Sequence, residues 1–287
     1  MDQAEKLRQL KKNLGGYEEV RKTPRVITVS SGKGGVGKTN FVVNLAIALA
    51  QQEKRVVIFD ADLGMANIDV LLGIIPKFNL YDVIEGHKEL NEIVITGPYN
   101  IKIIPGGSGI QELANIDSYR RERLIKGLKT IDNTADVILI DTGAGIAKNV
   151  LGFAGAADEV VVVMTPEPTS LTDAYGFIKA VSKYKLHSKV YLVVNKVANP
   201  QEANHTITRM KKVVERFLEL QLDPLGYIFE DKVVNKSVMK QKPFVLEYPN
   251  SNASRSIKQI ALNLIEGSYC PPRGTAGFMQ RLIRLFG

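Results

Sequence analysis

Short apolar runs alternate with longer amphipathic segments along most of the chain. The runs are rich in Val and Ile and lie at residues 26–29, 55–60, 101–104, 136–141, 159–164, 189–194 and 225–229. Segments with helical spacing of apolar residues follow several of them, at 41–51, 118–133, 169–184 and 203–220. Near-continuous apolar strands are typical of strands that are buried on both faces. The pattern therefore predicts an α/β fold, a single domain with a mainly parallel, doubly wound sheet covered by helices on both faces.

A glycine-rich loop lies between the first apolar run and the first helical segment. Residues 31–39 read SGKGGVGKT and satisfy the phosphate-loop pattern GxxxxGK[ST]. Glycines at these positions let successive backbone N–H groups converge on phosphate oxygens at a helix N-terminus. The residues expected to bind ATP here are Gly32, Lys33, Gly34, Gly35, Val36, Gly37, Lys38, Thr39 and Asn40. Lys38 is expected to reach the β and γ phosphates, and the Thr39 hydroxyl to ligate Mg²⁺.

Carboxylates follow two of the other apolar runs. Asp60 and Asp62 end the second run and share a face at the strand period, so both can address a magnesium ion and the attacking water. Asp141 ends the run at 136–141 and is followed by Gly143 and Gly145, which is the form of a Walker B strand and its switch. We expect Asp141 to hold Mg²⁺ through water and one of the two glycine backbones to sense the γ-phosphate.

The segment that contains Asn195, Lys196 and Ala198 indicates which nucleotide base is bound. The segment begins like the guanine-binding NKxD sequence, but Ala198 replaces the carboxylate that would pair with guanine. Adenine is therefore favoured. Asn195 is expected to meet the base, and the alternative is a buried asparagine that caps a strand end.

The string KGGVGKT resembles the deviant Walker A motif of the MinD and ParA ATPases, and the resemblance extends from about residue 25 to the C-terminus. It implies that Lys33 crosses to the nucleotide of a second subunit, so that a sandwich dimer forms only with ATP. It also implies that Asp60 lies near the metal, that Asp62 positions water and that Asn67 lies near the dimer face. Residues 225–231, LGYIFED, resemble a further family segment near the adenine, which gives Glu230 a contact with ATP.

Composition excludes several other classes of protein. The chain has 287 residues, 45% of them hydrophobic, with one cysteine and three scattered histidines, so neither a disulfide framework nor a zinc site is expected. It lacks an apolar signal and an 18-residue apolar span, which predicts a cytoplasmic protein. Most of the net charge of +8 lies at the two ends, because residues 1–25 carry seven Lys/Arg and four Asp/Glu, and residues 271–287 carry three arginines without an acid. No nucleic-acid partner is expected.

The last residues, 271–287, form a separate segment in this interpretation. Pro and Gly at 271–274 precede a short basic amphipathic helix, whose membrane-contacting residues are predicted to be Phe278, Met279, Arg281, Leu282, Ile283, Arg284, Leu285 and Phe286. Such a helix suits the surface of an anionic membrane and is too short to span one. The alternative is a terminal helix docked on its own core or on a partner. The match to the C-terminal membrane-targeting helix of MinD favours the membrane, at its inner face in the ATP dimer.

The first residues, 1–24, are predicted to form a partner-activating helix and linker before an ATPase domain at 25–270. DQAEKLR at 2–8 resembles the motif by which the flagellar branch of the MinD family, the FlhG or YlxH proteins, stimulates the signal-recognition-type GTPase FlhF. By that resemblance Gln3 lies nearest the partner's nucleotide, and Asp2, Leu7 and Arg8 hold the helix. The resemblance implies control of flagellum placement and number, with contacts to basal-body (C-ring) proteins. A MinD-like cell-division regulator and a ParA-like partitioning ATPase are the alternatives.

Overall fold

The computed structural model describes residues 23–62, 67–107, 117–267 and 272–286, and its centre is one eight-stranded sheet. The strands are β1 (Arg25–Ser31), β2 (Val56–Ala61), β3 (Ile95–Thr96), β4 (Lys102–Pro105), β5 (Val137–Ala144), β6 (Glu159–Met164), β7 (Lys189–Val197) and β8 (Gln221–Phe229). Their order in the sheet is β3-β4-β2-β5-β1-β6-β7-β8, and every pair is parallel except β3 with β4. The predicted fold class is confirmed.

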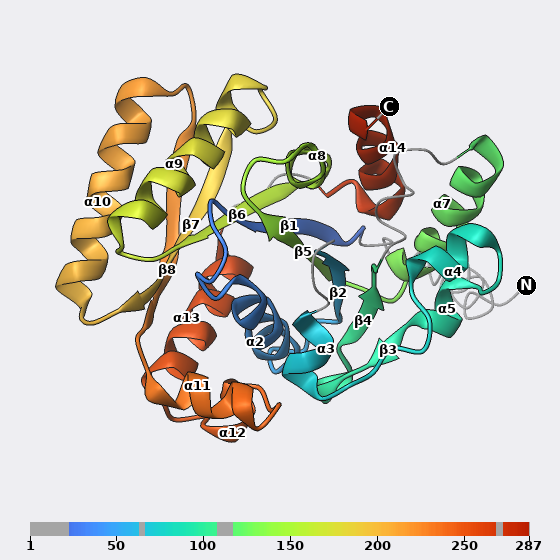
Figure 1. Cartoon of the computed structure of the whole chain (residues 1–287), viewed down its shortest axis with the longest axis horizontal. Coiled ribbons are helices and arrows are strands. Elements are labelled where there is room, and N and C mark those ends of the chain that lie inside the picture. The colour runs from blue at the N-terminus through green and yellow to red at the C-terminus, as the bar shows by residue number, and fades with distance from the viewer. Residues whose placement is uncertain (1–22, 63–66, 108–116, 268–271, 287) are drawn as a thin grey trace, which may run out of the picture.

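Helices cover both faces of this sheet (Figure 1). One layer contains α2 (Lys38–Ala50), α3 (Asn67–Leu72), α11 (Lys232–Met239), α12 (Phe244–Glu247) and α13 (Asn252–Glu266). The other contains α4 (Leu80–Glu85), α5 (Leu90–Ile93), α7 (Ser118–Asp132), α8 (Lys148–Ala156), α9 (Pro168–Lys183), α10 (Pro200–Phe217) and α14 (Gly274–Phe286). Successive strand residues alternate between the layers: Ile58 packs with α2 and α13, whereas Val57 and Phe59 pack with α7 and α8. Both faces are buried, which explains why the strands are apolar without interruption.

Two details of the sheet differ from the prediction. The edge strand β3 was not expected, because two residues are too few to show a strand period. β8 begins at Gln221, four residues before the predicted run, because its first half carries the polar residues Gln221 and Asp223 near the end of the sheet.

The C-terminal helix is seated on the body in this structure, the arrangement that the sequence analysis gave as the alternative to a membrane helix. The side chains of Phe278, Met279 and Leu282 are buried in the core between α7 and α8, and the Phe278 ring stacks on Phe153 with centroids 6.2 Å apart. Leu285 is 38% exposed. The apolar stripe that suits lipid also suits this hydrophobic seat, so the stripe alone cannot distinguish the two environments.

The polar side of the same helix faces outward. Arg284 is exposed, Arg281 and Ile283 are partly exposed, and the Phe286 side chain lies outside the described ones. The N-terminal residues predicted to activate a partner, Asp2, Gln3, Leu7 and Arg8, also lie outside the described residues. In the described part of the chain, no helix is both long and apolar enough to cross a bilayer.

Candidate nucleotide site

The phosphate loop joins β1 to α2 in the middle of the sheet. Gly37 lies just before α2 with φ 88°, a conformation that glycine adopts without strain, and a Cβ there would lie 2.5 Å from Asn195 Nδ2. Gly32 has no room for a side chain either, because the backbone at Asp173 of α9 approaches it closely. A cavity of about 450 Å³ opens above the loop, lined by the expected residues from Gly34 to Asn40. The N-terminus of α2 is thus a ready anion site.

Lys38 and Asp141 form a buried ion pair beneath this cavity. Lys38 Nζ donates to Asp141 Oδ1 at 2.6 Å, and the two residues are 7% and 1% exposed. Burial raises the pKa of Asp141, and the Lys38 ammonium opposes that rise. In this state the lysine that was predicted to contact phosphate neutralises the carboxylate that was predicted to hold the metal.

The described acidic side chains fit a divalent cation. Asp141 Oδ2 is buried and has no hydrogen-bond partner in the described part of the chain. Burial and the nearby Asp141 carboxylate raise the pKa of Asp60 to about 7, because the two negative charges lie close together in the protein interior. A bound cation would relieve both features. Magnesium prefers oxygen ligands, so Asp60, Asp141 and Thr39 are suitable residues to hold it.

Asp62 lies at the end of β2 beside the switch segment. Its backbone N–H donates to Asp60 Oδ1 at 3.2 Å, and its Oδ1 lies 3.5 Å from the position that a Cβ on Gly143 would occupy. β2 and β5 are neighbours with Asp60 opposite Asp141, so the sheet register brings the three acids to one edge.

Gly143 and Gly145, the predicted switch residues, lie at the end of β5 and just after it. Gly145 has φ 90°, and its N–H donates to the Ser31 carbonyl at 2.8 Å, which ties the segment after β5 to the start of the phosphate loop. Gly143 lies within β5. Asn67 is the first residue of α3, and its side chain lies outside the described ones.

Lys33 does not enter the cavity above its own loop. Its Nζ donates to Glu167 Oε2 at 2.6 Å, just before α9, and to Thr169 Oγ1 at 2.9 Å, in the first turn of that helix. The Lys33 side chain is 30% exposed and that of Glu167 is 60% exposed. The Lys33 ammonium lowers the pKa of Glu167 through this hydrogen bond.

A second cavity, of about 250 Å³, lies beside the loop where adenine is expected. Asn195 and Glu230 line it together with Gly37, Phe41 and Phe229. Asn195 Nδ2 also donates to the Val36 carbonyl at 2.7 Å, and its Oδ1 accepts the Lys196 N–H, so this side chain fixes the loop. Asn195 therefore lines the cavity and also makes a structural hydrogen bond to the phosphate loop.

Sequence reasoning missed the groups that hold the loop from outside. Glu167 and Thr169 bind Lys33, and Lys196 Nζ donates to the Gly35 carbonyl at 3.0 Å. The available signal was topological: Glu167 and Thr169 follow β6, Lys196 lies near the end of β7, and the carboxyl ends of parallel strands meet at the ligand-binding edge of such a sheet.

The fold and the site define a P-loop ATPase in which a second lysine stands at the start of the loop. The profile of the AAA domain family matches residues 24–194. Antiactivator FleN of Pseudomonas aeruginosa is 40% identical over 277 residues, covering 95% of this chain and 97% of its own. Flagellum site-determining protein YlxH of Helicobacter pylori is 34% identical over 282 residues, covering 96% and 95%.

Solved structures agree with this assignment. MinD in the MinC:MinD cell division complex of Aquifex aeolicus has a TM-score of 0.68 and 27% identity, covering 87% of this chain and 99% of that one. Septum site-determining protein MinD with Mg-ADP from Pyrococcus horikoshii has a TM-score of 0.67 and 25% identity, covering 85% and 96%. The chain belongs to the MinD/ParA family of ATPases, in the group that contains FleN and YlxH.

Proposed function

We propose that the protein is an ATP-dependent dimerising switch that controls the placement and number of flagella. The names of the FleN and YlxH relatives, an antiactivator and a flagellum site-determining protein, support the flagellar role. Their similarity covers 95–97% of each chain, which makes them better guides than the MinD relatives at 28–32% identity.

The position of Lys33 is the observation that best supports the proposed dimer. Lys38 lies beneath the phosphate cavity, whereas the ammonium of Lys33 points to Glu167 and Thr169 outside it. A lysine in this position does not serve the phosphates of its own chain. It can serve those of a second chain facing the same edge, at the cost of one solvent-exposed ion pair, which is a weak interaction.

In the proposed reaction the protein contributes positioning and charge. When phosphates enter, the Lys38 ammonium exchanges the Asp141 carboxylate for phosphate oxygens, and the Asp141 carboxylate becomes free to accept hydrogen bonds or to hold a cation. Mg²⁺, held by Thr39, Asp60 and Asp141, would neutralise charge on the transferring phosphoryl group. Asp62 orients the attacking water from the end of β2. The loop backbone N–H groups bind phosphate oxygens without reorganisation.

Membrane association is part of the proposal and needs a change in α14. The seated helix covers its own apolar side with the body, so only its arginine side is available to lipid. Full insertion requires Phe278, Met279 and Leu282 to leave the core. Two such helices in one dimer bind far more tightly than one, because the second insertion occurs at a high effective concentration.

The dimer is tested by the size of the protein with ADP and with a non-hydrolysable ATP analogue, measured by light scattering. Wild type is expected to be a dimer only with the ATP analogue. Lys33→Ala should bind the analogue and stay monomeric, whereas Glu167→Gln should still form the dimer because it removes only the partner within one chain. A normal dimer of Lys33→Ala refutes the role in trans, and a wild-type monomer at saturation refutes the proposal.

The N-terminal segment is proposed to stimulate FlhF, the GTPase named above. A peptide of residues 1–25 added to FlhF should raise GTP turnover, and the same peptide with Gln3 replaced by alanine should not. Equal turnover with and without the wild-type peptide would leave a MinD-like switch without this partner.

A further inference from the structure

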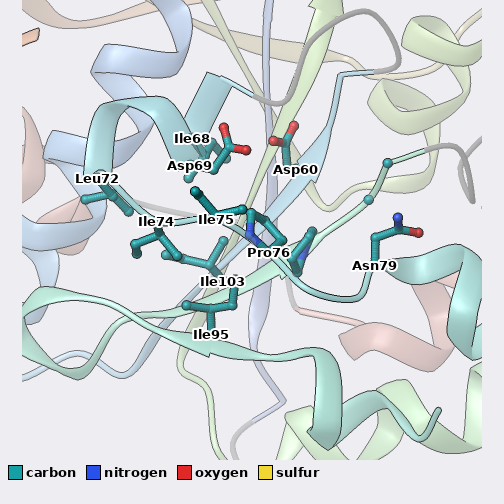
Figure 2. A pocket seen from close by; sticks show the side chains of 13 residues that line it. Asp60, Ile68, Asp69, Leu72, Ile74, Ile75, Pro76, Asn79, Ile95 and Ile103 are labelled. Atoms are coloured by element: carbon teal, nitrogen blue, oxygen red, sulfur yellow. The ribbon is translucent and has the colours of Figure 1, made fainter. Parts of the chain in front are cut away.

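An apolar pocket of about 260 Å³ lies on the other side of α3 from the phosphate loop (Figure 2). It is formed by α3, the connection from α3 to α4, the edge strand β3 and the end of β4. Its apolar lining consists of Ile68, Leu72, Ile74, Ile75, Pro76, Ile95, Ile103 and Pro105. It shares no lining residue with the two cavities beside the phosphate loop, but it adjoins the nucleotide site through Asp60, one of the residues suited to hold Mg²⁺.

Large apolar side chains are exposed in the segment that lines this pocket and in the residues that follow it. Ile75 is 90% exposed, more than any other large apolar side chain among the described residues, although it also lines the pocket. Phe78 and Tyr81 follow in the same connection and the start of α4, and each is 38% exposed. Exposed apolar residues gathered around a hydrophobic hollow are typical of protein-binding surfaces.

Two carboxylates give the pocket a negative end. Figure 2 shows the Asp60 and Asp69 carboxylates projecting toward the same end of the pocket, while the isoleucine side chains occupy the rest. Among the described residues that line the pocket there is no lysine, arginine or histidine. An occupant that places a positive charge at this end and an aliphatic group below it would match both parts of the lining.

We propose that this pocket, with the exposed side chain of Ile75 in its lining, binds a segment of a partner protein that inserts one apolar side chain next to a Lys or Arg. The volume is below the roughly 300–1,000 Å³ typical of sites for drug-sized molecules, which favours one or two protein side chains over a free cofactor. An anchor side chain in a pocket surrounded by apolar rim contacts is the usual arrangement of a binding hot spot. The position of Asp60 at the end of β2, two residues before Asp62, places the bound partner next to the switch.

The test uses the full chain with ADP, so it does not depend on dimer formation. A phage-displayed library of random ten-residue peptides is selected against the wild-type protein, and an enriched peptide is then synthesised and measured by fluorescence anisotropy. Enriched peptides should share an apolar residue within two positions of a Lys or Arg. Ile75→Asp should weaken the peptide at least tenfold, and Asp69→Asn about fivefold, with less effect of Asp69→Asn at high salt.

Tyr119→Asp is the matched control, because Tyr119 is also an apolar side chain with high exposure, 76%, and lies outside the pocket. It should leave the peptide affinity unchanged. Ile75 and Tyr119 are exposed, so neither substitution threatens the fold. The proposal is overturned if enriched peptides lack the basic residue, or if Ile75→Asp binds them as wild type does. Self-association of the ADP form that Ile75→Asp abolishes would make a second copy of the chain the occupant and would also overturn it.

Discussion

The nucleotide edge of the sheet and the seat of α14 both hold groups that the proposed switch needs elsewhere, but they hold them by different forces. At the nucleotide edge Lys33 and Lys38 are held by Glu167 and Asp141, which are charges that phosphate oxygens can replace. In the α14 seat, Phe278, Met279 and Leu282 are held by apolar packing. Only another apolar environment, such as a lipid bilayer, can replace it.

The difference sets an expected order of events. Release of Lys33 breaks an exposed pair, which water and salt already weaken. Release of α14 into water would expose three buried side chains, at about 1.5–3 kcal/mol each. We therefore expect ATP alone to bring two chains together, and α14 to leave its seat only where lipid receives it.

The largest expected effect is a loss of ATP hydrolysis without a loss of the dimer, caused by a substitution at the nucleotide edge. Asp62→Ala should lower ATP turnover by about 10²-fold or more, because water is no longer oriented by a carboxylate at the end of β2. The ATP dimer should persist, since Lys33 is unchanged. Phosphate release and light scattering measure the two properties on the same sample.

Asp69→Asn is the control for that variant, because Asp69 lies on the adjacent helix α3 outside the phosphate cavity. It should hydrolyse ATP at the wild-type rate. Normal ATP turnover by Asp62→Ala would contradict the role of Asp62 in orienting the attacking water.

The next effect concerns the apolar side of α14. Phe278→Ala should lower the free energy of unfolding by about 3 kcal/mol, because it removes a buried ring that stacks on Phe153 and leaves a cavity. Urea denaturation measures this value. Leu285→Ala, at a partly exposed position on the same helix, should cost far less. Equally small losses of unfolding free energy for both variants would mean that α14 is not packed on the body in solution before ATP binds.

The same contrast explains what could be predicted from the sequence. The phosphate loop, Asp60, Asp62 and Asp141 were placed correctly at one edge because strand, loop and helix are consecutive, and parallel strands align their ends. The partner of Lys33 was not found, because Glu167 is 134 residues away and its approach depends on the packing of α9. The seat of α14 was considered only as the alternative, because an amphipathic stripe does not specify which apolar surface it meets.

The smallest expected effect lies on the polar side of α14. Arg284 is exposed, so Arg284→Gln should leave the stability unchanged. It should weaken binding of the ATP-bound protein to phosphatidylserine-containing vesicles about fivefold per helix, since each basic residue near an anionic surface contributes roughly 1 kcal/mol. Vesicle pelleting at low salt measures the loss, with Gln280→Ala as the control at an exposed uncharged position of the same helix. Unchanged binding by Arg284→Gln would contradict an electrostatic contribution from this side of α14. The membrane would then be recognised by the apolar side alone, after it leaves its seat.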